Sequence, residues 1–144
     1  MDFFTAMNIS ASALNVQRVK MNVIASNLAN IDSTKSEQGG PYRRKDVVIS
    51  PYPVKDFGET LNSQMEEGMQ GVKVESIVED QRPFKFKYDP SNPEADEKGN
   101  VAMPNISLME EMVNMMNASR SYEANVTALN SAKNMALRAL DIGR

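Results

Sequence analysis

The chain has 144 residues, of which 16 are lysine or arginine and 19 are aspartate or glutamate, so its formal net charge is −3. It contains no cysteine and no histidine, which excludes disulfides, thiol- or histidine-based catalysis and the usual ligand sets of zinc, haem and iron–sulfur clusters. The slight acidity argues against nucleic acid as a partner. Without a run of about 18 apolar residues, we expect no direct membrane insertion. We therefore predict that the protein is not an enzyme and needs neither a cofactor nor a metal.

Glycine and proline divide the chain into three segments. All seven prolines and six of the seven glycines lie between residues 36 and 104, and the seventh glycine is Gly143. Segments 1–35 and 105–144 therefore have no helix breaker in their interior. We predict an α+β fold, in which long N- and C-terminal heptad helices pair as a coiled-coil-like hairpin. The central segment, 36–104, forms a small β-rich and turn-rich insertion between them.

Segment 1–35 predicts one long helix, because its apolar residues recur at spacings of three and four. One row comprises Met7, Ser10, Leu14, Gln17, Met21, Ile24, Leu28 and Ile31. A second row beside it comprises Ala6, Ile9, Ala13, Val16, Lys20, Val23, Asn27 and Asn30. The apolar arc is thus wider than one partner helix would cover.

Segment 105–144 repeats this design. Its first row comprises Leu108, Met112, Met115, Ser119, Tyr122, Val126, Leu129, Lys133, Ala136 and Leu140. A second row comprises Ser121, Asn125, Ala128, Ala132, Met135, Ala139 and Ile142. Pro104 precedes the predicted helix, Ser107 and Glu110 fit a capping box, and Gly143 fits a C-terminal cap.

The central segment predicts short strands separated by turns. Residues 46–49 and 72–78 are candidate strands. In a third, Phe84, Phe86 and Tyr88 alternate with lysines, which is typical of a half-buried strand. Residues 89–100 are rich in turn formers and predict a loop. Residues 53–70 are left without an assignment.

The second rows on the terminal helices allow two interpretations. Burying a Val, Ile or Met side chain is worth about 1.5–3 kcal/mol, so rows left in water would favour assembly with further helices. Alternatively, the second rows fold back onto the chain's own β-rich segment. Periodicity alone favours neither interpretation.

Several motifs resemble a known family. Residues 25–34 (ASNLANIDST) resemble the N-terminal signature of the axial proteins of the bacterial flagellum. Residues 39–48 (GGPYRRKDVV) and 118–126 (ASRSYEANV) narrow this resemblance to the proximal rod proteins of the flagellar basal body. Further matches, such as Met103-Pro104-Asn105, extend it over nearly the whole chain.

The resemblance implies a structural subunit of the proximal rod, whose terminal helices pack in the inner wall of a tube that serves as drive shaft and export channel. It implies copies of the same chain, other rod subunits and the membrane-ring and export apparatus as partners. It also implies export by the flagellar type III apparatus without a cleaved signal peptide, in agreement with Asp2, which stands where such a peptide carries positive charge. The alternatives are another rod subunit of the same family and a self-contained helical-hairpin binding module.

The candidate assembly residues come from the heptad rows and from two polar motifs. The apolar candidates are Met7, Leu14, Met21, Ile24, Leu28, Met112, Met115, Tyr122, Val126, Leu129 and Leu140. The polar candidates are Asn27, Asn30, Arg43 and Arg44. Met109, Met112, Met115 and Met116 together form either an adaptable apolar surface or plain helix core.

The polar candidates also allow two interpretations each. The amides of Asn27 and Asn30 either fix the turn into the central segment by bonding to neighbouring backbone, or form an ordinary polar cap. Arg43 and Arg44 either dock on an acidic groove of an adjacent subunit through bidentate carboxylate contacts, or lie in a solvated turn before the strand at 46–49.

Overall fold

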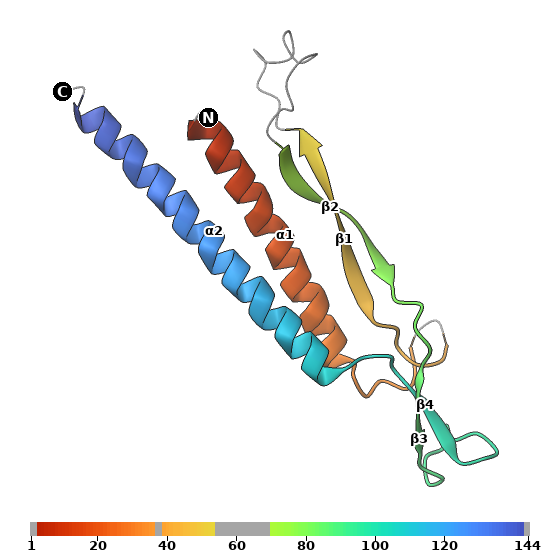
Figure 1. The fold of residues 1–144 in the computed structure, drawn as a ribbon. Helices are drawn as coiled ribbons and strands as arrows, with labels where there is room; N and C mark the ends of the chain where they lie inside the picture. Colours follow the sequence, from red (N-terminus) through yellow and green to blue (C-terminus); the bar gives the residue numbers. More distant parts are fainter. Residues whose placement is uncertain (1–2, 37–38, 54–69, 143–144) are drawn as a thin grey trace.

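The computed structural model describes residues 3–36, 39–53 and 70–142. Its elements, in chain order, are α1 (Phe3–Ala29), β1 (Lys45–Pro53), β2 (Gln70–Glu79), β3 (Lys85–Tyr88), β4 (Asn100–Met103) and α2 (Leu108–Ile142). Two long terminal helices thus precede and follow two small two-stranded sheets in the chain, which confirms the predicted α+β fold (Figure 1). Among these described residues, none of the helices combines the length and apolarity needed to cross a membrane.

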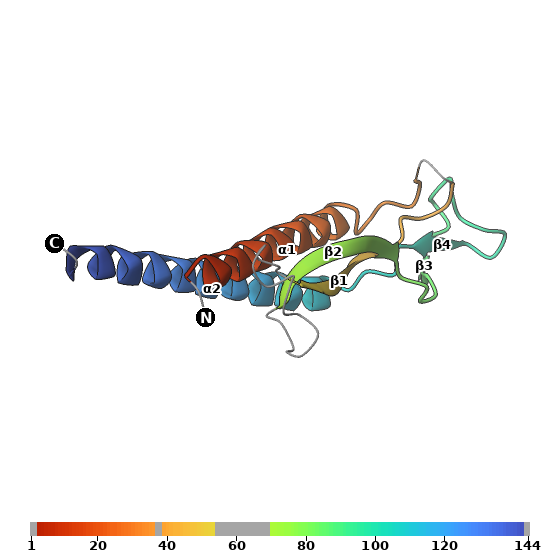
Figure 2. The same cartoon turned by 90° about the horizontal axis from the view of Figure 1, so that it is seen from above.

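The two helices lie side by side and run in opposite directions, with both chain termini at the same end (Figures 1 and 2). Helix α1 has 27 residues and α2 has 35, so they are about 40 and 52 Å long. The predicted hairpin is therefore confirmed. Because α2 is longer by about two turns, its C-terminal end extends past the start of α1.

Helix α1 ends at Ala29, earlier than its apolar row, which continues to Ile31. The Asn30 side chain donates to the Ser26 carbonyl at 2.9 Å, and the Asn30 N–H is shared between the carbonyls of Ser26 and Asn27 at 3.2 Å each. This shared bond tightens the last turn and lets the chain leave the helix. The helix thus ends six residues before the limit of segment 1–35.

Helix α2 begins directly after Ser107, whose carbonyl accepts the Glu111 N–H at 3.0 Å. The residues before it, Pro104 to Ile106, are buried. The Glu110 carboxylate contacts Arg82. The predicted cap at Gly143 lies outside the described residues.

Strands β1 and β2 form an antiparallel hairpin that runs along α1 (Figure 1). Both strands are longer than the predicted 46–49 and 72–78. Proline interrupts a central strand but is tolerated on an edge strand. Both strands of a two-stranded sheet are edge strands, so β1 can continue through Pro51. A bulge between Val48 and Ile49 shifts the register and increases the local twist. Residues 54–69, most of the stretch left unassigned, lie outside the described residues.

Helix α1 is packed on two sides, by α2 and by the β1–β2 hairpin. The Ser12 hydroxyl accepts the Val72 N–H at 3.2 Å, which ties the helix directly to β2. Val16 and Val23 of the second row and Ile24 of the first row are all buried. The second row of α1 is therefore covered in part within the chain, where Val23 borders Lys45 of β1 and Ile77 of β2.

Strands β3 and β4 form a short arm that projects beyond the helices (Figure 1). The prediction of a half-buried strand is wrong, because all four residues of β3 are exposed. Phe86 and Tyr88 are 70% and 71% exposed, since a two-stranded ribbon has no second layer to cover this face. Phe84, just before the strand, is half-buried.

Gly99 lies at the end of the loop of this arm, and its backbone conformation predicts that replacing it with alanine destabilises the arm. Gly99 has φ +77°, and a Cβ there would lie 2.9 Å from Cε2 of Tyr88 and 3.2 Å from Cβ of Pro90. Because the backbone is left-handed and the Pro90 ring cannot move aside, Gly99→Ala should destabilise the arm by more than about 1 kcal/mol. Hydrogen exchange of the arm amides measures this.

Gly40→Ala is the matched control, because Gly40 has the same φ of +77° but no atom within 4 Å of the added Cβ. It carries the backbone strain without the clash. We expect Gly99→Ala to accelerate exchange in the arm more than Gly40→Ala does in its own turn. Equal effects would show that contact with Tyr88 and Pro90 contributes nothing.

Candidate assembly interface

A buried polar cluster joins the end of α1, the start of β1 and the start of α2. It comprises Asn27, Arg44, Asn105 and Glu111, all of which are buried. The Arg44 Nε donates to Glu111 Oε1 at 2.8 Å, and the Asn27 amide donates to Glu111 Oε2 at 3.0 Å. Both carboxylate oxygens are thus satisfied, as a buried charge requires. The cluster fixes three elements that are far apart in sequence.

Asn27 also acts as a backbone-like partner for β1. Its Nδ2 donates to the Lys45 carbonyl at 2.8 Å, and its Oδ1 accepts the Lys45 N–H at 2.9 Å. The Tyr42 hydroxyl donates to the same Oδ1 at 3.2 Å. The predicted bonding of the Asn27 amide to neighbouring backbone is confirmed, and it holds the start of the strand against the helix.

Arg44 remains charged inside this cluster. Burial alone would lower its pKa, but hydrogen bonds to the carboxylates of Glu111 and Asp46 outweigh this effect and raise the pKa above its ordinary value. Its Nη1 lies 3.1 Å from Asp46 Oδ2 and 3.5 Å from Asp80 Oδ2. The guanidinium is therefore paired within its own chain by three carboxylates.

Asn105 extends the cluster to the turn after β2. Its Oδ1 accepts the Arg44 N–H at 2.9 Å, and its Nδ2 donates to the carbonyls of Asp80 and Arg82 at 3.2 and 3.1 Å. The Asp80 carboxylate accepts the Arg82 N–H at 2.9 Å and its Nε at 2.7 Å. The turn is thereby locked onto the segment that leads into α2.

This arrangement predicts a dependence of stability on pH. The Arg82 N–H, with the Arg82 guanidinium, holds the pKa of Asp80 below its ordinary value of 3.8 against the opposing effect of desolvation. A carboxyl whose pKa is lower in the folded state stabilises that state above the unfolded pKa, and this contribution is lost as pH falls through the folded pKa. We expect the urea midpoint to fall below about pH 4. Asp80→Asn should lower the midpoint at pH 7 and flatten its acid dependence.

Glu97→Gln serves as the control, since Glu97 is exposed and has no ion-pair partner among the residues that the structure describes. Its acid dependence should follow that of the parent chain. Identical pH profiles for Asp80→Asn and the parent chain would contradict a stabilising role of Asp80.

The row of α2 that faces α1 has a strict heptad period. Its buried members, Glu111, Ala118 and Ala132, are separated by multiples of seven. Four half-buried residues, Met115, Tyr122, Leu129 and Ala136, follow the heptad positions 111, 118, 125 and 132 by four residues each. We call these seven residues the inner row. Small residues allow the two helix backbones to approach closely, and the period is that of a coiled-coil seam.

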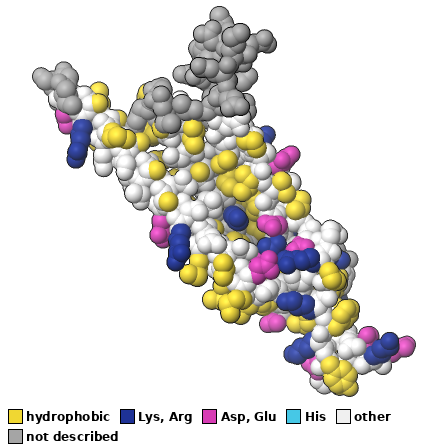
Figure 3. All heavy atoms as spheres, viewed as in Figure 1, with side chains coloured by type: hydrophobic (Ala, Val, Ile, Leu, Met, Phe, Trp, Pro, Cys, Tyr) yellow, Lys and Arg dark blue, Asp and Glu magenta, His cyan; other side chains and the backbone are white. Residues whose placement is uncertain are grey.

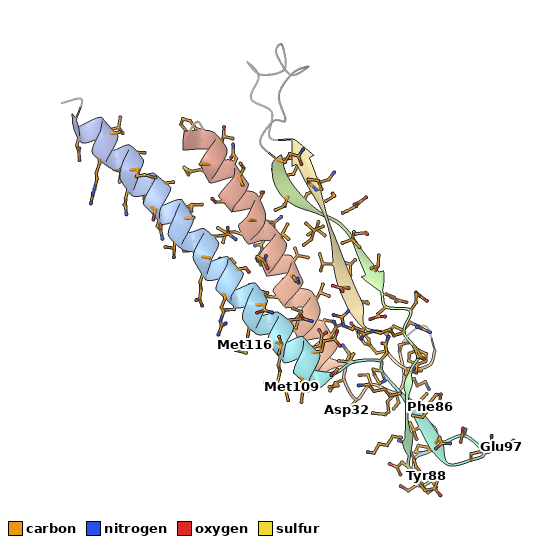
Figure 4. All side chains as sticks on the ribbon, viewed as in Figure 1. Asp32, Phe86, Tyr88, Glu97, Met109 and Met116 are labelled. Carbon is orange, nitrogen blue, oxygen red and sulfur yellow. The ribbon has the colours of Figure 1, made fainter. Side chains whose placement is uncertain are left out.

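The opposite side of α2 carries an exposed apolar surface near the start of the helix. We call it the methionine face; it comprises Leu108, Met109, Met112, Val113 and Met116, each about half exposed or more. Met109 and Met116 project away from α1 (Figure 4), and hydrophobic side chains gather over this end of α2 (Figure 3). Met109, Met112 and Met116 are thus surface residues rather than plain helix core, whereas Met115 is half-buried.

The structure divides the predicted assembly residues into three groups. Ile24, Asn27 and Arg44 are buried within the chain. Half-buried are Met7, Leu14, Met21, Leu28, Asn30, Arg43, Met115, Tyr122, Val126 and Leu129. Exposed are Met112 and Leu140, the latter where α2 extends past the start of α1.

The prediction that Arg44 lies in a docking loop or a solvated turn is wrong. Its carboxylate partners, above all Glu111, belong to its own chain, because β1 begins against both helices rather than after an exposed loop. Arg43 is different: its Nη1 donates to the Asp80 carbonyl at 3.3 Å, and its guanidinium lies 4.3 Å from the centre of the Phe84 ring. Arg43 lines a groove beside the turn that joins α1 to β1.

Sequence reasoning did not find Glu111 or Asn105 as cluster residues. The signal for Glu111 is an acidic residue at a heptad position of an otherwise apolar or small row. Its partner Arg44 is 67 residues away, so no local pattern connects the two.

Comparison with known proteins identifies the family. The family model described as "Flagella basal body rod protein" matches residues 7–35, and that described as "Flagellar basal body rod FlgEFG protein C-terminal" matches residues 97–142. The chain is 46% identical to the flagellar basal-body rod protein FlgC of Bacillus subtilis, over the full length of both. It is 44% identical to FlgC of Escherichia coli O157:H7 over both full lengths, and 41% identical to FlgC of Borreliella burgdorferi over 99% and 98% of the two chains. The chain belongs to the FlgC family of flagellar basal-body rod proteins.

Proposed function

We propose that this chain is a structural subunit of the flagellar basal-body rod, and that it polymerises through its terminal helices. The observation that carries the proposal is the methionine face, an apolar surface on the side of α2 that points away from α1. The full-length similarity to FlgC proteins supports the same function.

Burial of such a surface drives association. Each of its side chains would gain about 1.5–3 kcal/mol on full burial, and a contiguous apolar patch of this kind marks an interaction site. Methionine suits a subunit that must contact neighbours of different sequence, since its flexible thioether adapts to irregular surfaces. Leu140, 70% exposed beyond the start of α1, offers a second apolar contact at the other end of α2.

The finer functional assignment follows the resemblance to proximal rod proteins. The terminal helices would form part of the wall of the drive shaft and of the export channel. Partners would be copies of the same chain, other rod subunits, and the membrane-ring and export apparatus. The chain would be exported by the flagellar type III apparatus without cleavage of a signal peptide, and would act by assembly rather than by catalysis.

The polar cluster supports a mechanical role in this setting. A rod that transmits torque needs its outer parts fixed rigidly to its helical core. Asn27, Arg44 and Glu111 connect both helices to the first residues of β1 through hydrogen bonds of 2.8–3.0 Å. Buried and mutually satisfied polar groups of this kind favour a single relative arrangement of the elements they join.

The test is association of the purified chain in sedimentation experiments over a range of concentrations. Met112→Asp combined with Met116→Asp should weaken association by more than about tenfold, because two charges would have to be buried at the contact. The far-ultraviolet circular dichroism of the isolated chain should not change, since Met116 projects away from α1 and about half of the Met112 side chain is exposed.

Asn130→Asp is the control, since Asn130 is an exposed residue of α2 outside the methionine face. It adds the same kind of charge without touching the apolar surface. Unchanged association of the double variant, or an equal loss in the Asn130 variant, would contradict polymerisation through the methionine face.

The self-contained binding module is favoured by one observation, the coverage of α1 by the β1–β2 hairpin. That coverage leaves α1 satisfied on two sides without a second chain. A self-contained module predicts helix content and sedimentation that are independent of concentration, whereas a rod subunit predicts that both increase with it.

A further inference from the structure

Two aromatic side chains lie uncovered on the arm formed by β3 and β4. Phe86 and Tyr88 are two residues apart on β3, so they project from the same side of the ribbon, and they are 70% and 71% exposed. We call this pair the aromatic face; Figure 4 labels both residues on the arm. Aromatic side chains contribute strongly to binding when a partner covers them, so this pair is a candidate contact surface.

The other side of the arm is turned toward the rest of the chain. Lys85 Nζ donates to the Ile106 carbonyl at 2.5 Å. Val101 of β4 pairs with Lys87 of β3 and is 2% exposed. Because the residues of a cross-strand pair lie on the same side of a ribbon, Val101 and Lys87 are on the side opposite the aromatic face. The arm is thus held by one side and presents the aromatic face outward.

The methionine face covers only the first turns of α2. The row through Met109, Met112 and Met116 continues along the helix at spacings of three and four residues. The residues that continue it are Arg120, Glu123, Thr127 and Asn130, all exposed and none of them apolar. A partner helix lying along the whole row would bury these polar side chains, which costs free energy. The methionine face therefore fits a short element better than a long helix.

The aromatic face matches the methionine face in length and in chemistry. Residues 108–116 extend about 13 Å along α2 at 1.5 Å per residue. The four residues of β3 extend about 13 Å at 3.3 Å per residue. Methionine sulfur packs favourably against aromatic rings, and its flexible side chain adapts to their shape. Each face can thus cover the other without burying the polar residues further along α2.

The arm of a chain does not cover the methionine face of the same chain. Phe86 is 70% exposed and Met109 73% exposed, although both lie near the same end of the molecule (Figure 4). Pro104 and Asn105, between the arm and α2, are buried and fix the direction in which the arm projects. A second copy placed beside the first, with its helices in the same direction, needs only a short shift to bring its arm to the methionine face.

We infer that the aromatic face of one copy of this chain packs on the methionine face of a second copy. The inference rests on the proposed function and names the surface that covers the methionine face. The contact joins two different surfaces, so it is heterologous and leaves one free face of each kind on the pair. Contacts of this type generate rings or open helical assemblies, as a polymerising subunit requires.

Thiol cross-linking tests the contact directly, because the chain contains no cysteine. Asn100→Cys lies opposite Tyr88 in the ribbon, and Asn117→Cys lies one turn after Val113, so both faces stay intact. A mixture of these two single variants, treated with a short thiol-specific cross-linker, should yield a dimer containing one chain of each kind. The chain that carries both substitutions should yield a ladder of multimers on a denaturing gel.

The matched control is Asn130→Cys in place of Asn117→Cys. Asn130 is exposed on the same helix, about 20 Å further along at 1.5 Å per residue. Its mixture with Asn100→Cys should give no more than about a tenth of the dimer, since a heterologous contact has one register. Equal yields would show random collision and overturn the inference.

Three further cross-linking results would overturn the inference. A cross-linked monomer of the doubly substituted chain would show that the arm folds onto its own helix. A dimer formed by Asn117→Cys alone would show that two methionine faces pack on each other. Association without any cross-link between positions 100 and 117 would show that a different surface covers the methionine face.

Substitution of the aromatic face provides an independent test. Phe86→Ser should weaken association by about tenfold, because it removes an aromatic anchor from the contact. The arm itself should stay folded, since the Phe86 ring is mostly exposed, and hydrogen exchange of the β3 amides checks this. Lys87→Ser, on the other side of the same strand, is the control and should change association by less than about twofold. Equal losses in the two variants would overturn the inference.

The contact is apolar, so salt should not weaken it. Raising the salt concentration to about 1 M should leave the cross-linking yield unchanged, since salt screens charges but not apolar contacts. A tenfold fall would show a contact between charges and overturn the inference. Normal association of Phe86→Ser, while Met112→Asp with Met116→Asp still blocks it, overturns this inference alone. Absence of association at every concentration overturns the proposed function as well.

Discussion

Replacing Glu111 with alanine should destabilise the chain by about 3 kcal/mol. The substitution leaves the buried guanidinium of Arg44 without its closest counter-charge, at 2.8 Å, and the Asn27 amide without one acceptor. Breaking a buried ion pair from one side costs about 3–5 kcal/mol. We place the effect at the lower end because Asp46 and Asp80 still face Arg44. Urea denaturation followed by circular dichroism measures it.

A double-mutant cycle provides the control. Arg44→Met and Glu111→Leu are the single variants of the cycle, and the combined variant Arg44→Met, Glu111→Leu removes both charges together. Because paired charges replaced by apolar groups often cost little, the combined variant should be more stable than the sum of the single effects predicts. Strict additivity would show that Arg44 and Glu111 do not act as a pair.

Leu129→Asp should block both the pairing of the helices and assembly. Leu129 belongs to the inner row of α2, and it lies half-buried between the two helices. The substitution removes an apolar contact and buries part of a carboxylate at the same site. It should therefore lower the free energy of unfolding by about 2–3 kcal/mol. We expect a lower urea midpoint in vitro, and normal expression with loss of motility in the organism.

Leu14→Asp on α1 should behave in the same way, because Leu14 is half-buried on the shorter helix. Asn130→Asp, at the exposed position next to Leu129, should leave stability and motility unchanged. A normally motile Leu129→Asp strain would contradict the importance of the inner row.

The helices were predictable from sequence, but the side that α2 presents to α1 only in part: Met115, Tyr122, Leu129 and Ala136 of the predicted first row do belong to the inner row. The apolar period pointed to a row containing Leu108 and Met112, both of which the structure leaves exposed. The buried positions are instead Glu111, Ala118 and Ala132, one charged and two small. Apolar content is a poor guide here, because the charge of Glu111 is compensated by a residue that is distant in sequence.

The strands show a similar division. Alternation located the strands at 72–78 and 84–88, since period two is a local property. It did not distinguish a half-buried strand from an exposed one, because burial of Phe86 depends on whether a second layer covers it. In the described part of the chain no such layer covers Phe86 or Tyr88.

The role of Asn27 was partly predictable. An amide near a helix end indicates bonding to local backbone; Asn30 does this with the Ser26 carbonyl, whereas Asn27 bonds to Lys45, 18 residues away. The bond to Glu111 spans 84 residues and depends on the antiparallel placement of α2. Local chemistry was therefore accessible from the sequence, while its tertiary partner was not.

The most direct test of the central claim is to isolate basal bodies from the organism that encodes this chain and to locate the chain in them by mass spectrometry and immunogold labelling. A rod subunit should co-purify with the basal body and label the rod, and deletion of its gene should leave cells without a complete rod and non-motile. Recovery of the chain only outside the basal body, together with normal motility of the deletion strain, would contradict the account.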